Sequence, residues 1–272
     1  MQPGKECGFE TDVNVPLIVR GPGIAKGKVT EIVTTHTDLA PTFLSLIGGT
    51  IRSDFDGSAI PVHASALESY SLQDAKSEHV NIEFWGFALT EGEYDQGVFW
   101  NHTYKALRLI GKDYNLYYSV WCSGEHELYD LKVRCSLDPL SASLTVLQED
   151  PYQLSNLYPT NHSATFSFSA TSSTNLFHLL PRLDSLILVL KTCKTRSCTH
   201  PWEVLHPEGD VKTLHDALHK KFDHFYETEQ ERVSFTKCEK GYILESEGAI
   251  GAKSFSINEV KARGGRMWSE LV

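Results

Sequence analysis

The chain has 272 residues, which is enough for one or two domains with a sizeable core. Hydrophobic residues make up 41% and charged residues 22%, a composition typical of a globular protein rather than a disordered one. The net charge of -10 argues against a general affinity for nucleic acid or anionic membranes, and no apolar run reaches the roughly 18 residues of a membrane span. We therefore expect no nucleic-acid partner and no transmembrane segment.

The first fifty residues predict a strand, a loop, a second strand and a helix. Residues 13–19 have the pattern of a buried strand, and Ile32 and Val33 suggest a short one. Asp38 is the predicted N-cap of a helix over residues 39–47, which ends at a glycine pair. So few strands cannot form a sheet that is covered on both faces. The segment is therefore predicted to be the tail of a larger α/β sheet.

A polar connector at residues 50–78 precedes a change of pattern. Four short segments rich in aromatic and β-branched residues follow, separated by turn-like sequence, and they predict an antiparallel meander. Helices are predicted at residues 183–190 and 211–226 from their apolar faces. Two Ser/Thr-rich stretches, residues 136–145 and 160–174, are predicted loops. The four predicted strands are residues 80–87, 103–110, 116–121 and 127–131.

The cysteines and two sequons indicate the compartment. None of the six cysteines forms a CxxC pair, which argues against a zinc cluster. Cys193 and Cys198 are five residues apart in a polar segment and predict a local disulfide. Asn101 and Asn161 each begin a glycosylation sequon. Together these features favour a secreted, extracellular glycoprotein.

One motif is split by a segment of different character. Glu127-Leu-Tyr-Asp-Leu-Lys132 is followed by residues 133–148, and then by Glu149-Asp-Pro-Tyr-Gln-Leu-Ser-Asn-Leu157. Without the sixteen residues the text reads ELYDLKEDPYQLSNL. Every Val codon begins with GT, one Gln codon ends in AG, and the segment runs from Val133 to Gln148. We therefore interpret it as a translated retained intron; the alternative is a natural surface loop, which costs little stability.

The rejoined motif resembles the closing signature of the sulfatases. Two earlier segments also resemble that family: KECGFETDVNVPLIVRGPG, which begins at Lys5, and HTDLAPTFLSL at residues 36–46. Four others are similar to secreted fungal-type arylsulfatases: NHTYKALRL, YNLYYSVWC, RLDSLILVLKTC and HPWEVLHPEGDV. The chain is therefore identified as resembling the C-terminal portion of a sulfatase.

The resemblance implies an alkaline-phosphatase-like fold, with α/β and α+β parts. Residues 1–62 are then the C-terminal remnant of the catalytic α/β domain. Residues 79–272 are an antiparallel-sheet subdomain with C-terminal helices, interrupted by residues 133–148. The resemblance also implies hydrolysis of a sulfate monoester by a formylglycine made from Cys or Ser in a C/S-x-P-x-R motif, with calcium as cofactor.

Only part of that machinery is expected here. No C/S-x-P-x-R motif occurs, so no catalytic residue is assigned. No metal-binding residue is assigned either, and no cofactor is expected to bind this chain. Lys5 matches the sulfate-contacting lysine of the family, whose ammonium suits a sulfate oxygen. His215, His219 and His224 are interpreted as a solvated polar face. We expect the chain to be inactive by itself. The alternatives are a non-catalytic module that binds a sulfated ligand or a partner, and a related phosphoester or phosphonate hydrolase.

Overall fold

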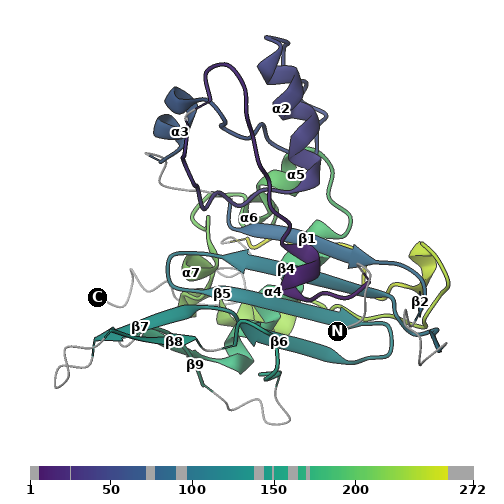
Figure 1. Cartoon of the computed structure of the whole chain (residues 1–272). Coiled ribbons are helices and arrows are strands. Elements are labelled where there is room, and N and C mark those ends of the chain that lie inside the picture. The colour runs from purple at the N-terminus through teal and green to yellow at the C-terminus, as the bar shows by residue number, and fades with distance from the viewer. Residues whose placement is uncertain are drawn as a thin grey trace.

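A four-stranded antiparallel sheet lies at the centre of the structure (Figure 1), a computed structural model that describes residues 6–24, 26–71, 77–89, 97–137, 144–148, 150–158, 165–169 and 172–256. Its strand order β1-β4-β5-β6 confirms the predicted meander. A short ladder of β2 and β3 lies between β1 and β4 in sequence. The bounds are β1 (His79–Phe84), β2 (Ala88–Leu89), β3 (Val98–Phe99), β4 (Tyr104–Ile110), β5 (Asn115–Trp121) and β6 (His126–Asp130).

The two faces of this sheet have different partners. Side chains alternate along a strand, so Leu107 and Tyr118 lie on one face, in the large hydrophobic cluster with helix α4 (Leu176–Leu190). Ala106 and Tyr117 belong to a smaller cluster on the other face. Helix α4 is buried along nearly its whole length and begins seven residues before the predicted helix at 183–190. The larger core cluster therefore forms where α4 and the C-terminal elements pack on one face of the meander.

The prediction of a single helix at residues 211–226 is wrong. Local caps divide the segment, because Thr213 and Asp216 form a capping box and the His219 side chain accepts from the Lys221 N–H. The apolar positions still reach the core, as Leu214 and Phe222 are buried in the large cluster. The C-terminal elements are α5 (Arg196–Thr199), α6 (Pro201–Leu205), α7 (Leu214–Ala217), the 3-10 helices η2 (Lys220–Phe222) and η4 (Leu244–Ser246), and the π-helix η3 (Phe225–Glu229).

The first part of the chain contains helices and extended backbone. Residues 13–19 and 32–33 form no strand, so both predicted strands are wrong. A strand requires a neighbour for its backbone hydrogen bonds, and none is built beside these residues within the described chain. The predicted helix at 39–47 is confirmed to within one residue. The elements are α1 (Glu10–Val13), the 3-10 helix η1 (His36–Asp38), α2 (Leu39–Leu46) and α3 (Ala64–Ser71).

Asp38 has a different role from the predicted N-cap of α2. Its carboxylate accepts from the Thr35 N–H at 2.7 Å, as part of a capping box at η1, and from the Ser58 N–H at 2.7 Å. The 3-10 turn that precedes α2 moves the cap three residues upstream. Asp38 thus ties the start of the helical segment to the loop around residue 58.

The Ser/Thr-rich stretches predicted as loops also contain strands. Strand β7 (Val133–Leu137) pairs with β8 (Leu144–Gln148), and β9 (Thr165–Ser169) pairs with β10 (Ser172–Asn175). The first and last residues of the intervening segment, Val133 and Gln148, are direct partners. The two ends of the sixteen-residue segment therefore lie side by side.

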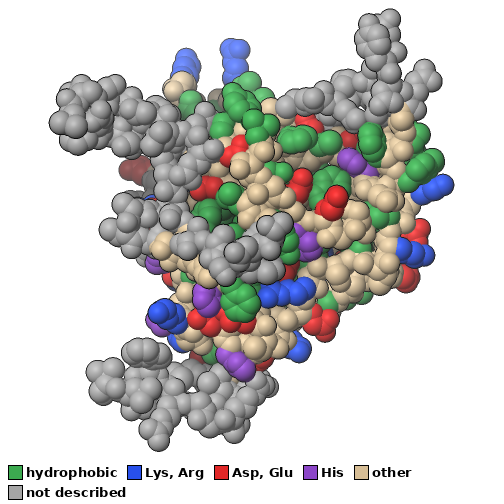
Figure 2. Space-filling model, turned by 90° about the horizontal axis from the view of Figure 1, so that it is seen from below, with side chains coloured by type: hydrophobic (Ala, Val, Ile, Leu, Met, Phe, Trp, Pro, Cys, Tyr) green, Lys and Arg blue, Asp and Glu red, His purple; other side chains and the backbone are tan. Residues whose placement is uncertain are grey.

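The surface is chemically mixed. Acidic, basic and histidine side chains are interspersed with apolar ones on the face seen from below (Figure 2). Within the described residues, no helix combines the length and the apolar character needed to cross a bilayer. The observed architecture is a mixed arrangement of helices and antiparallel sheets.

Candidate functional site

The segment that follows Lys5 in sequence is fixed on the sheet face opposite α4. Lys5 itself lies outside the described residues, as does Asn161. The Arg108 guanidinium, buried on β4, donates to both carboxylate oxygens of Glu10 at 2.8 and 2.9 Å. Burial raises the pKa of Glu10, but the hydrogen bonds and charge of Arg108 outweigh it, so this pKa is lowered overall. Glu10 is therefore held as a carboxylate in a paired, partly buried site.

Gln153 provides a second anchor for the same segment. Its side-chain oxygen accepts from the Glu10 N–H at 2.6 Å, and its amide nitrogen donates to the Gly8 carbonyl at 3.3 Å. Gly8 lies so close to the sheet that a Cβ there would be 1.6 Å from the Tyr117 hydroxyl oxygen. Only glycine allows this approach without displacement.

A third set of contacts holds the residues before Gly8. The Leu89 N–H donates to the Glu6 carboxylate at 3.1 Å, and the His102 ring donates to the Glu6 carbonyl at 3.0 Å. Cys7 lies beside the same ring, with its Sγ 4.0 Å from Nε2 of His102. Residues 6–10 are thus attached by the backbone of β2, by Arg108 of β4, and by side chains from the segments that flank the strands.

The second half of the split motif forms the structure that presents Gln153. Both oxygens of Asp150 accept backbone N–H bonds at 2.8 Å, from Leu154 and Ser155. Asn156 accepts from the Leu128 N–H at 3.0 Å, and so joins this turn to β6. The motif is therefore a structural clamp: β6 supplies the sheet edge, and the turn after it holds the segment next to Lys5.

A cavity of about 440 Å³ lies between the first part of the chain and the sheet. Its cation Lys191 is already paired with Glu247 at 2.8 Å, both buried. Asn81 Oδ1 is buried at this wall without a hydrogen-bond partner among the described residues. The acidic lining does not suit a sulfate anion. The charged and polar lining residues include Asp38, Asp56, His79, Asn81, Glu83 and Lys191.

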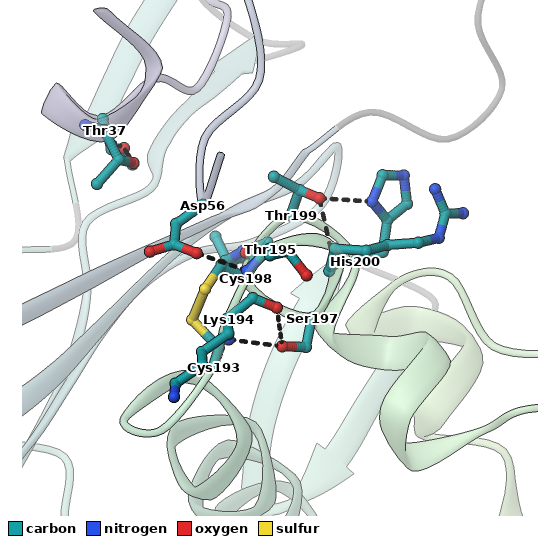
Figure 3. The surroundings of a disulfide bond; sticks show 12 residues. Thr37, Asp56, Cys193, Lys194, Thr195, Ser197, Cys198, Thr199 and His200 are labelled. Carbon is teal, nitrogen blue, oxygen red and sulfur yellow. Dashed lines mark hydrogen bonds between the residues drawn. A yellow bond between two sulfur atoms is a disulfide. The ribbon is translucent and has the colours of Figure 1, made fainter. Parts of the chain in front are cut away.

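The disulfide expected between Cys193 and Cys198 is present beside this cavity (Figure 3). Its loop holds Thr195 at a positive φ of 56°, with the backbone N–H donating to Asp56 from the first part of the chain. A second disulfide, Cys122–Cys238, joins residues 116 apart and was not predicted. No local spacing signals such a pair, because only the fold brings the two cysteines together.

The remaining site predictions concern modification and metal. Asn101 is exposed, so its sequon is accessible, and its glycosylation stays a prediction. Among the described residues, one group of three metal-ligating side chains occurs: His178, Asp223 and Glu227. It contains an imidazole, whereas calcium takes oxygen ligands. This group therefore does not match the calcium site that the resemblance implies, and no catalytic step is assigned through that ion.

Comparison with known proteins identifies relatives over most of the chain. It is 37% identical to Sulfatase ppz1 of Metarhizium majus over 262 residues, which are 96% of this chain and 49% of that protein. It is 31% identical to an arylsulfatase of Volvox carteri and 32% identical to one of Chlamydomonas reinhardtii, in each case over 82% of this chain and 32% of the relative. The chain thus spans from about a third to about half of the length of these relatives. No family model and no solved structure matches it.

Proposed function

The chain belongs to the sulfatase family, and from this premise we propose that it is the C-terminal portion of a secreted arylsulfatase-like sulfuric ester hydrolase. The complete enzyme would convert a sulfate monoester and water to an alcohol or phenol and sulfate. A formylglycine residue would supply the nucleophile, and calcium would be the metal. Neither the formylglycine precursor nor the calcium ligands would belong to this chain. By itself the chain is inactive.

In this proposal the chain contributes a sulfate-binding cation, Lys5. An ammonium group on a flexible stem can follow and neutralise a sulfate oxygen as charge develops during the reaction. The observation that carries the proposal is the anchoring of the residues next to it. Arg108 and Gln153 fix the backbone at Gly8 and Glu10. Residues 6–10 are therefore held at one place on the sheet, as the positioning of a substrate-binding segment requires.

The exposed apolar surface of the first part of the chain supports the same proposal. Ile18 is 88% exposed and Ile47 81% exposed, although both resemble core positions in sequence. Large hydrophobic side chains grouped in one segment of the surface are typical of an interface. Here the remainder of the catalytic α/β domain would cover this surface. The two disulfides support the secreted location, since such bonds persist in oxidising compartments.

A chimera tests this function. The chain would replace the matching half of the Metarhizium majus sulfatase, and hydrolysis of a chromogenic aryl sulfate would be measured. We expect turnover in the chimera and a loss of about 100-fold or more in kcat/KM with Lys5→Ala. Lys28→Ala, in an exposed part of the same region, is the control and should retain activity. A folded chimera without turnover, or one that is indifferent to Lys5→Ala, contradicts the proposed role.

The isolated chain supplies the complementary measurement. We expect no turnover of the aryl sulfate at any calcium concentration, because the nucleophile motif is missing from its sequence. Calcium-dependent hydrolysis by the purified chain would show that it is a complete catalyst and would overturn the proposal of inactivity.

A further inference from the structure

Three potential metal ligands from separate elements of the second half of the chain converge on one another. His178 lies on α4, Asp223 follows η2, and Glu227 belongs to the π-helix η3. The ligand atoms, Nδ1 of His178 and one carboxylate oxygen from each acid, all lie within 4.8 Å of one another. We propose that these residues bind a divalent transition-metal ion, Zn²⁺ or a close analogue. This site is independent of the proposed sulfatase function and of the calcium implied by the resemblance.

The distances suit such an ion after small side-chain movements. Nδ1 of His178 is 2.5 Å from Oε1 of Glu227 and 3.8 Å from Oδ2 of Asp223. A tetrahedral zinc ion separates its nitrogen and oxygen ligands by roughly 3.4 Å, given metal–ligand bonds of about 2.1 Å. The two observed distances lie on either side of that value. Rotation of the Glu227 carboxylate away from the ring would open the position for the ion.

Arg182 contacts two of the three residues, through the side chain of Asp223 and the backbone of His178. Its side chain is fully buried, and its Nη2 donates to Oδ1 of Asp223 at 2.7 Å. Its Nη1 donates to the His178 carbonyl at 2.6 Å. The guanidinium therefore uses one oxygen of Asp223 and leaves Oδ2 directed toward the imidazole. The bond to Asp223 is made to a ligand side chain, and hydrogen bonds of that kind help to fix the geometry of protein metal sites.

Charge and access also favour a cation. Arg182 offsets one of the two carboxylates, so the group of Arg182, Asp223 and Glu227 retains one net negative charge. The side chains of His178 and Asp223 are 39% and 28% exposed, which leaves room for a water as fourth ligand. An adjoining cavity of about 590 Å³, lined by both residues, provides an entry path.

The ligand types decide between metals. One imidazole and two carboxylates suit Zn²⁺, Co²⁺ or Ni²⁺, whereas Ca²⁺ takes six to eight oxygen ligands. The simpler explanation of the cluster is a hydrogen bond between His178 and Glu227 without a bound metal. The two explanations predict different responses to added metal, and the experiment below separates them.

The test uses the full chain, freed of metal with a chelator and titrated with ZnCl2 in a calorimeter. CoCl2 provides a second readout, because tetrahedral Co²⁺ has visible absorption bands that report its ligands. We expect one equivalent of Zn²⁺ to bind, a rise in the melting temperature, and no comparable binding of Ca²⁺. His178→Gln and Glu227→Gln should each weaken Zn²⁺ binding by more than about 100-fold.

His224→Gln is the matched control. His224 is an exposed histidine of the same region, paired with Glu229 at 3.6 Å, and it is not one of the three ligands. It should leave both the affinity and the Co²⁺ spectrum unchanged. Circular dichroism checks that each variant is folded, and Glu227→Gln can keep its hydrogen bond to His178. The proposal is overturned if folded wild-type chain binds no Zn²⁺, or if binding survives in His178→Gln.

Discussion

The two parts of this molecule differ in how they use apolar residues. In residues 6–24 and 26–70, only Gly8, Pro41 and Thr42 are buried. The hydrophobic clusters of the described chain instead draw on residues 82–255, where α4 packs on the meander. Nine large hydrophobic side chains between Val15 and Ile51 are exposed, among them Val29, which is 94% exposed.

This difference shows that the two parts are stabilised by different kinds of interaction. The second part is held by its own core, whereas the first part is held by polar contacts to it. Such hydrogen bonds join the Glu10 carboxylate to Arg108, the Gly8 carbonyl to Gln153, and the Asp56 carboxylate to the Thr195 N–H. A polar attachment of this kind contributes far less than a core, because each hydrogen bond adds only about 1 kcal/mol net. We therefore expect the first part to detach before the second part unfolds.

The largest expected effect comes from a cavity in the second part. Leu186 on α4 is fully buried, and Leu186→Ala should lower the free energy of unfolding by about 2–5 kcal/mol. Leu46→Ala, at a residue 40% exposed on α2, is the matched control and should cost less than about 1 kcal/mol. Urea denaturation followed by circular dichroism measures both. Equal losses would show that the first part shares the core.

The stability of the second part is also expected to depend on pH, through the buried Glu78. Glu78 is buried, and desolvation raises its pKa from the usual 4.5 to about 7, although Trp202 Nε1 and the Leu214 N–H each donate to it at 2.8 Å. The folded state thus binds this proton more tightly than the unfolded state. Its contribution is fully present below pH 4.5 and is lost as the pH rises to about 7, by roughly 3 kcal/mol in all.

Glu78→Gln isolates that contribution, because a neutral amide of the same shape does not titrate. The difference in unfolding free energy between wild type and variant should change between pH 4.5 and pH 7 in favour of the variant. The measurement is urea denaturation at several pH values in that range. A difference that stays constant with pH would show that Glu78 titrates normally in the folded state.

The attachment of the first part is tested at Gly8. Gly8→Ala places a methyl group against the Tyr117 hydroxyl, and the strain should weaken the docking of residues 6–14 by about 1–3 kcal/mol. Hydrogen exchange of the Glu10 N–H should accelerate, with little change in the amides of α4. Gly241→Ala is the control, since its Cβ would meet nothing within 4 Å. Equal protection in both variants would mean that the segment tolerates the displacement.

The smallest effect is expected on the exposed apolar surface. Ile18→Ser and Ile47→Ser should each change the free energy of unfolding by less than about 0.5 kcal/mol, because neither side chain is buried. They should instead reduce self-association, which light scattering measures. A loss of more than about 1 kcal/mol would show that these residues are packed in the free chain.

Sequence-based prediction succeeded where the signal was local and failed where the structure depends on residues far apart in the chain or on caps inside a segment. The meander, the helix at 39–47 and the Cys193–Cys198 pair were confirmed, because alternation, an apolar helical face and a five-residue spacing are local signals. The strands at 13–19 and 32–33 were wrong, because a strand depends on a neighbour that the described chain does not provide. The helix at 211–226 was wrong because caps within the segment divide it.

The amino-acid sequence by itself determined the family, since the two halves of the split motif and the segment from Lys5 are short local patterns that can be recognised without coordinates. The tertiary structure alone assigned the clamp of Gln153 on Gly8, the disulfide Cys122–Cys238 and the convergence of His178 with Glu227. These partners are 145, 116 and 49 residues apart. No local pattern encodes such distances, because the packing of α4 and the meander brings the segments together.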